Sequence, residues 1–267
     1  MGLADVHAHL THPRLAGRIP ALLDRARERG ITTIISNGLN PGDNAAVLAL
    51  ARAHPMVRPG FGFYPVDAVL TDLRAMNVEY YRDAESVSAD DGVAWVRDHV
   101  EEAFVIGEIG LDGHWVPEAL WEQQEDVFRR LVRLAMEADK PMVIHTRRRE
   151  RRAFEILQEL GATRVDWHCF GSKVKLARQI AEHGHYLSIP ANARRSESFT
   201  RMLETLPRDR LLLETDCPYL GPDREHANEP ANVAGTAAYA AELWRTSEAE
   251  VATRLGENFA RLFGETA

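Results

Sequence analysis

Two histidines stand one residue apart near the amino terminus, in the run Asp5-Val6-His7-Ala8-His9. Alternate residues of a β-strand point to the same side, so one metal ion could reach both imidazoles. Either histidine alone would be better explained as a hydrogen-bonded or surface residue. Two polar side chains facing the interior of a barrel are costly unless something satisfies them. We therefore predict that His7 and His9 bind a metal.

Two carboxylates lie within or just after apolar runs. Glu108 lies inside the run from Val105 to Leu111, where a buried carboxylate needs a cation, an arginine or backbone amides. Its two oxygens could bridge two metal ions. Asp216 follows Leu211-Leu212-Leu213-Glu214-Thr215 and could bind a metal or take a proton from an attacking water.

Two further histidines, His145 and His168, each stand at the tip of a hydrophobic strand pattern, where a hydrogen-bonded core histidine is the alternative. Together with His7, His9, Glu108 and Asp216 they form a set of nitrogen and carboxylate ligands without thiolates. Such a set suits Zn²⁺, Mn²⁺, Mg²⁺ or Co²⁺ rather than an iron–sulfur centre.

Short β-branched and apolar runs alternate with longer amphipathic segments, which is the pattern of repeated βα units. The predicted strands are Leu3–His9, Thr32–Ser36, Val57–Gly62, Phe104–Ile109, Met142–His145, Arg164–His168, Tyr186–Ile189 and Arg210–Glu214. The predicted helices include Ile19–Arg29, Asn44–Ala53, Ala119–Ala138, Arg152–Leu160, Lys175–His183 and Ser198–Leu206. Eight such units predict an α/β fold of the (β/α)₈ TIM-barrel type.

An open doubly wound sheet would give the same alternation of strands and helices. The six candidate ligands lie at or just beyond the ends of predicted strands, where the active sites of barrels gather, and this favours the barrel. No linker divides the chain, so we predict a single domain over residues 1–267, with an irregular insertion around Val66–Asp90. Two helical patterns between Ala231 and Phe263 should pack outside the barrel, the second capped near Ser247.

The composition is that of an ordinary globular enzyme, with 45% hydrophobic and 27% charged residues. The sequence has no signal-peptide pattern and no long apolar run, so we expect a cytoplasmic protein without a membrane partner. Two cysteines, Cys169 and Cys217, offer no disulfide framework. The oligomeric state is open, and a monomer is compatible with the sequence.

A net charge of −8 argues against attraction of the whole surface to nucleic acid. The local charge after His145 is positive, because a run of arginines follows it: Arg147, Arg148, Arg149, Arg151 and Arg152. A run of arginines at the start of a helix is as often a solvated face as a binding surface.

The order and spacing of these residues resemble the TatD family of metal-dependent deoxyribonucleases, which are amidohydrolase-like barrel hydrolases. The resemblance covers nearly the whole chain. It rests on Asp5-Val6-His7-Ala8-His9, Gly107-Glu108-Ile109-Gly110-Leu111-Asp112, Gln124-x-x-Val127-Phe128, Val143-Ile144-His145-Thr146-Arg147, His168-Cys169-Phe170, Leu212 to Leu220 and Asn228-Glu229-Pro230.

The resemblance implies a two-metal hydrolase with DNA or another nucleic acid as its substrate. It implies that His7, His9 and Asp216 hold one divalent cation, that His145 and His168 hold the other, and that Glu108 lies between them. Catalysis would then depend on Glu108 and Asp216, and Arg147 would contact phosphate, because its planar fork pairs two phosphate oxygens.

One family position is different here. Members usually carry Gly-x-His-Pro after the third strand, and this chain has Gly62-Phe63-Tyr64-Pro65. The phenol of Tyr64 could donate a hydrogen bond to substrate, but its reference pKa of ~10 makes it a poor acid near neutral pH. A packing role at the rim is the alternative for Tyr64. His114, in the loop after Asp112, is better explained as a solvent-exposed residue than as a substrate contact.

Two other functions are alternatives to that of a deoxyribonuclease. Metal-dependent hydrolysis of an ester or amide, such as deacylation of a D-aminoacyl-tRNA, uses the same chemistry on a carbonyl carbon. A non-enzymatic barrel that keeps a metal site for a binding partner is disfavoured, because all six candidate ligands are present.

Overall fold

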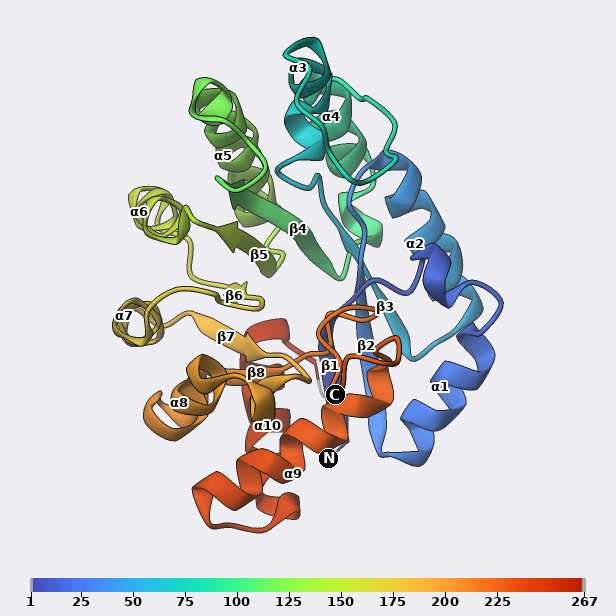
Figure 1. Cartoon of the computed structure of the whole chain (residues 1–267), viewed down its shortest axis with the longest axis vertical. Helices are drawn as coiled ribbons and strands as arrows, with labels where there is room; N and C mark the ends of the chain where they lie inside the picture. Colours follow the sequence, from blue (N-terminus) through green and yellow to red (C-terminus); the bar gives the residue numbers. More distant parts are fainter. Residues whose placement is uncertain (1, 266–267) are drawn as a thin grey trace.

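The chain folds into a ring of parallel strands surrounded by helices, in a computed structural model that describes residues 2–265 (Figure 1). All eight strands form one sheet in sequential order. They are β1 Leu3–Ala8, β2 Ile31–Asn37, β3 Val57–Phe61, β4 Val105–Asp112, β5 Met142–Arg147, β6 Val165–Trp167, β7 Tyr186–Ile189 and β8 Leu211–Leu213. The predicted (β/α)₈ barrel is therefore confirmed.

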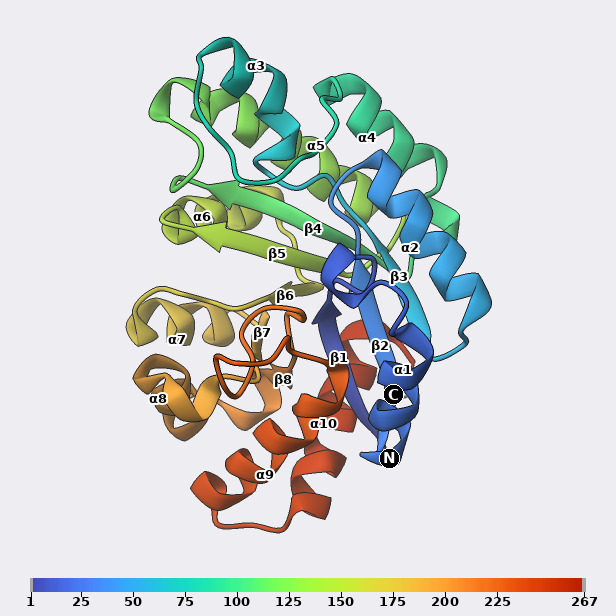
Figure 2. The same ribbon diagram turned by 45° about the vertical axis from the view of Figure 1, so that its right-hand side comes forward.

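Helices follow the strands and cover the outside of the ring, as Figure 2 shows from a second direction. They are α1 Ile19–Glu28, α2 Pro41–Ala53, α3 Leu70–Ala75, α4 Ala89–Asp98, α5 Trp121–Glu137, α6 Glu150–Leu160, α7 Val174–Glu182, α8 Glu197–Thr205, α9 Val233–Trp244 and α10 Glu248–Phe263. None of these described helices is both long and apolar enough to span a bilayer.

The ring closes between β8 and β1, and backbone hydrogen bonds just beyond β8 hold this seam together. The Asp216 amide donates to the His7 carbonyl at 2.8 Å, and the His9 amide donates to the Cys217 carbonyl at 2.9 Å. The Asp5 carboxylate, fully buried, accepts from the Thr215 amide at 2.8 Å. These bonds place residues from opposite ends of the sequence side by side at the carboxyl end of the barrel.

The lengths of four strands differ from the prediction for reasons that the backbone shows. β4 continues to Asp112 and β5 to Arg147, because the two strands stay paired as far as Asp112 and Arg147. β6 and β8 are shorter than predicted. Each is followed within a few residues by a residue of positive φ, Cys169 at 43° and Asp216 at 54°, which turns the chain out of the sheet.

The insertion around Val66–Asp90 is more ordered than predicted, because it contains α3 and the start of α4. The Ser88 side chain caps α4 by accepting from the Asp91 amide at 3.1 Å. Figures 1 and 2 both show α3 and α4 beside α5.

The two carboxyl-terminal helices have different places. α9 packs on the outside against α8, as predicted. α10 begins with a capping box at Ser247 and Glu250, and its Phe259, Leu262 and Phe263 pack on apolar residues of six strands. These strand residues are Val6, Ile35, Val105, Val143, Tyr186 and Leu212. α10 therefore covers one end of the barrel interior rather than lying outside it, and the polar site occupies the other end.

Candidate metal centre

Three candidate ligands meet at the seam between β1 and β8. His7 and His9 come from the end of β1, and their Nε2 atoms are 3.2 Å apart. The Asp216 Oδ1 atom lies 3.6 Å from His7 Nε2 and 3.3 Å from His9 Nε2. His7, His9 and Asp216 are hereafter the seam side of the site.

The other two histidines come from neighbouring strands. His145 lies on β5 and His168 directly follows β6, and His145 Nδ1 is 3.4 Å from His168 Nε2. These two residues are hereafter the β5–β6 side.

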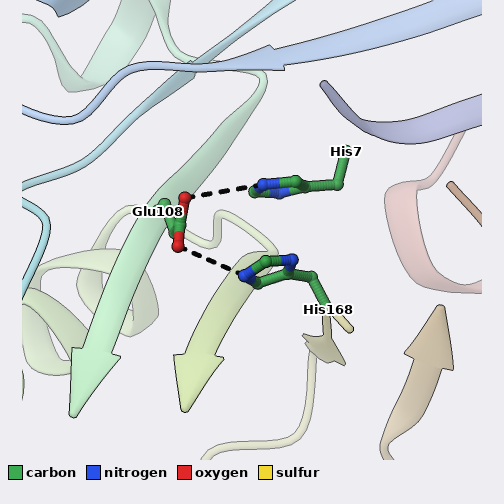
Figure 3. Close-up of side chains that lie close together, drawn as sticks. All are labelled: His7, Glu108 and His168. Atoms are coloured by element: carbon green, nitrogen blue, oxygen red, sulfur yellow. Dashed lines mark hydrogen bonds and ion pairs between the residues drawn. The ribbon is translucent and has the colours of Figure 1, made fainter. Parts of the chain in front are cut away.

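Glu108, from the middle of β4, lies between the two sides and offers a different oxygen to each. Its Oε2 is 3.5 Å from His7 Nε2 and 3.4 Å from His9 Nε2. Its Oε1 is 2.8 Å from His145 Nδ1 and 3.2 Å from His168 Nε2. Figure 3 shows His7 and His168 pointing at opposite oxygens of this carboxylate. The arrangement is that of a carboxylate able to bridge two cations.

The spacing of these atoms fits divalent cations. Ligands held ~2.1 Å from Zn²⁺ in a tetrahedron stand roughly 3.4 Å apart. The seam-side atoms and Glu108 Oε2 are separated by 3.2 to 3.6 Å. Among the described residues, His7, His9 and Asp216 form one group whose ligand atoms all lie within 4.8 Å of one another, and His7, Glu108 and His168 form another. Facing imidazole nitrogens at such distances need a shared proton or a cation between them.

The pKa shifts of the buried side chains also fit a site that binds cations. Burial, together with the nearby His168, lowers the pKa of His7 to about 4, so His7 is neutral as a metal ligand must be. Burial would raise the pKa of Glu108, but His168 and the other imidazoles hold it well below its usual value. Burial would lower the pKa of His168, but Glu108 raises it well above the ordinary value. Bound cations would neutralise the negative charge of the buried Glu108 carboxylate.

The outer contacts of the imidazoles differ between the two sides. On the seam side His9 Nδ1 lies 3.1 Å from the Asn37 backbone carbonyl. On the β5–β6 side His145 Nε2 lies 3.1 Å from the buried carboxylate of Asp112, and His168 Nδ1 lies 3.8 Å from Glu214. A ligating histidine whose second nitrogen contacts a carboxylate or carbonyl is oriented by it.

A cavity of about 200 Å³ opens onto the site. Besides five of the candidate ligands it is lined by His12, Leu39, Tyr64, Tyr81, Arg82 and Tyr219. Tyr64 is only 8% exposed, and its hydroxyl lies 3.5 Å from His145 Nε2. Burial raises the pKa of Tyr64 well above its ordinary value, so the phenol stays protonated and can donate. Tyr64 therefore lies beside the candidate ligand His145, and its contact with substrate stays a prediction.

The arginine run separates into two groups. Arg149 and Arg152 both pair with Glu125 of α5, and Arg149 also stacks 4.1 Å from the Trp121 ring. These two arginines join α5 to α6. Arg147 is exposed, whereas Arg148, Arg149, Arg151 and Arg152 all line a groove of about 550 Å³, together with Lys173, Lys175 and the acidic Glu150 and Glu155.

Several residues of the site were missed or undervalued from the sequence. In the sequence Asp112 belongs only to a motif, although its even spacing from Glu108 on one strand indicates that both carboxylates share a face. Tyr81 and Arg82 carried no signal, because they lie in the irregular insertion. His114 does not line the cavity, and the thiols of Cys169 and Cys217 have a pKa raised well above normal by burial, in keeping with packing roles.

The chain is similar to known proteins over nearly its whole length. Residues 4–264 match the family model described as TatD related DNase. The chain is 30% identical to a metal-dependent hydrolase of Bacillus subtilis, YabD, and 28% identical to human deoxyribonuclease TATDN3, covering 98% of itself in both matches and 98% and 95% of the two relatives. The crystal structure of the Escherichia coli TatD homologue YJJV superposes with a TM-score of 0.83 at 24% identity, over 98% of each chain. The resemblance seen in the sequence is therefore confirmed, and the chain belongs to the TatD-related DNase family.

Proposed function

We propose that this protein is a two-metal hydrolase that cleaves phosphodiester bonds in DNA. The observation that carries the proposal is the position of Glu108, whose Oε2 meets His7 and His9 while its Oε1 meets His145 and His168. One cation is assigned to His7, His9 and Asp216, and a second to His145 and His168, with Glu108 shared. The nitrogen and carboxylate donors suit Zn²⁺, Mn²⁺, Co²⁺ or Mg²⁺.

When bound, two divalent cations lower the pKa of water and neutralise charge on the oxygens of a phosphodiester. Asp216, at the edge of the cavity with 14% of its side chain exposed, orients the attacking water and takes its proton. Its pKa is lowered by the hydrogen bond from His9, in spite of burial, so Asp216 enters the reaction as a carboxylate.

Two residues are assigned to the substrate. Tyr64 donates its phenolic hydrogen to a non-bridging phosphate oxygen, because its raised pKa keeps it protonated. Arg147 is exposed directly after the β5 ligand and pairs with a phosphate through its guanidinium. The neighbouring groove is lined by six cationic side chains beside Glu150 and Glu155, and this local excess of positive charge supports a polyanionic substrate despite the net charge of −8.

The experiment is hydrolysis of labelled single-stranded DNA by metal-reconstituted protein in Mg²⁺, Mn²⁺, Co²⁺ and Zn²⁺, with the Glu108→Gln variant as the inactive control. We expect metal-dependent cleavage by the wild type that chelation abolishes. Unchanged DNA with every metal would overturn the proposal. Release of an aminoacyl group from tRNA, without cleavage of DNA, would indicate that the same site acts on a carbonyl ester.

A further inference from the structure

The aromatic residue Tyr81 stands exposed at the entrance to the metal cavity. Its side chain is 61% exposed, which makes it one of the few large hydrophobic groups that the described residues leave in solvent. It nevertheless lines the same cavity as His9, His145 and Asp216. An exposed aromatic ring at a functional opening is more informative than an isolated one elsewhere on a surface.

Tyr81 is supported by two other rings. Its ring centroid lies 5.0 Å from that of Tyr80 and 5.2 Å from that of Trp115. Tyr80 and Trp115 in turn pack against the buried cluster that contains Tyr64 and Val66. The Tyr81 ring thus contacts two supported aromatic rings, inclined by 70° to Tyr80 and by 43° to Trp115, and the rest of its surface stays open to a ligand.

Long-range contacts fix the segment that carries Tyr81, although it has no regular secondary structure. Arg82 makes two bonds to the fully buried Asp67, at 3.1 and 3.2 Å. The same carboxylate accepts from the Asn40 side chain at 2.8 Å. Arg74 of α3 donates to the Ala84 carbonyl at 2.7 Å. The chain is therefore held directly after Tyr81, at Arg82 and Ala84.

The size of the cavity limits what can enter it. At about 200 Å³ it is smaller than the ~300 to 1,000 Å³ of ordinary small-ligand pockets. A phosphate group held at the candidate ligands would occupy much of this space. The base attached to that phosphate would then lie toward the rim, where Tyr81 stands.

We infer that Tyr81, backed by Trp115, is a stacking platform for an unpaired nucleobase next to the phosphate held at the metal centre. The inference rests on the proposed nuclease function and names how its substrate is held. Stacking on a flat ring accepts any base but requires that the base be unpaired, since a base inside a duplex already stacks on its neighbours.

The test compares wild type, Tyr81→Ala and Tyr81→Phe on a single-stranded oligonucleotide and on the same oligonucleotide with one abasic nucleotide beside the cleaved bond. The abasic nucleotide should raise the KM of the wild type by roughly 5- to 150-fold, the effect of ~1–3 kcal/mol of stacking per base. Tyr81→Ala should raise KM on the intact strand by the same factor and no longer distinguish the two substrates. Tyr81→Phe should behave as the wild type, and Met76→Ala, which removes another exposed apolar side chain, should have no effect.

A second measurement does not depend on cleavage. With the protein in chelator, fluorescence of a 2-aminopurine nucleotide should be quenched on binding to the wild type and to Tyr81→Phe, but not to Tyr81→Ala. Equal discrimination between intact and abasic strands by wild type and Tyr81→Ala would overturn the platform, as would equal quenching by both. Quenching that requires Tyr81 but no cleavage with any metal would leave the platform standing and refute the proposed nuclease function instead.

Discussion

The two sides of Glu108 obtain their geometry from different sources. On the seam side, backbone hydrogen bonds tie Asp216 to His7 and Cys217 to His9, and the outer nitrogen of His9 meets a backbone carbonyl. On the β5–β6 side, His145 and His168 stand at the ends of separate strands, and their outer nitrogens face the side chains of Asp112 and Glu214.

The difference indicates that closure of the barrel itself places the seam-side ligands, whereas acidic side chains orient the β5–β6 ligands. Substitution of Asp112 or Glu214, which are outside the ligand set, should therefore disturb the β5–β6 side selectively. Substitution of the shared carboxylate should disturb both sides.

The largest effect is expected for Glu108→Gln. The amide keeps the shape of the side chain but removes the negative charge that both sides share. We expect kcat to fall by ~10⁴-fold or more, because both cations lose a ligand and each stabilises several kcal/mol of transition-state charge. Bound metal, measured by elemental analysis, should fall on both sides. The exposed Glu101→Gln is the matched control, and a variant that keeps its metals and its activity would contradict the bridging role.

Asp216→Asn should act on the seam side alone. The variant loses a ligand and the proton acceptor, so we expect kcat to fall by ~10²- to 10³-fold. About one equivalent of metal should be lost, while the equivalent assigned to His145 and His168 remains. Loss of both equivalents would mean that the two sides are not separable. The comparison would then fail.

The sequence contains enough information to predict the ring of strands and the six candidate ligands. The strands are short apolar runs of the right spacing, and the ligands are polar residues at the ends of such runs, where parallel strands of a barrel converge. Both signals are local. His7 and His9, one residue apart on a strand, even indicate which side chains point together.

The contacts that distinguish the two sides depend on packing, and no local pattern contains them. The pairing of Arg149 and Arg152 with Glu125, 24 to 27 residues earlier, exists because α5 packs beside α6. The position of Tyr81 depends on the bonds between Arg82 and Asp67, inside a segment without periodicity. A sequence pattern predicts which face a residue is on, but not which residue of another element it meets.

Asp112→Asn tests the β5–β6 side without touching a ligand. The amide can no longer orient His145 as a carboxylate does, and we expect metal affinity on this side to fall by ~10- to 100-fold. The equivalent bound at the seam side should be retained, in contrast to the result for Glu108→Gln. A calorimetric titration with metal measures the binding of both metal equivalents. The exposed Asp98→Asn should leave both unchanged, and loss of the seam-side metal instead would reverse the assignment of Asp112.

The smallest effect is expected for Tyr64→Phe, which removes one hydroxyl beside His145. A neutral hydrogen bond contributes ~0.5–1.5 kcal/mol, so KM for DNA should rise by roughly 2- to 12-fold with metal content unchanged. Tyr239→Phe removes a hydroxyl that bonds Thr200 far from the cavity and should leave KM unaltered. A Tyr64→Phe variant with unchanged KM would make the phenol a packing residue at the rim. A variant that instead loses metal would show that Tyr64, like Asp112, supports the ligands of the β5–β6 side rather than the substrate.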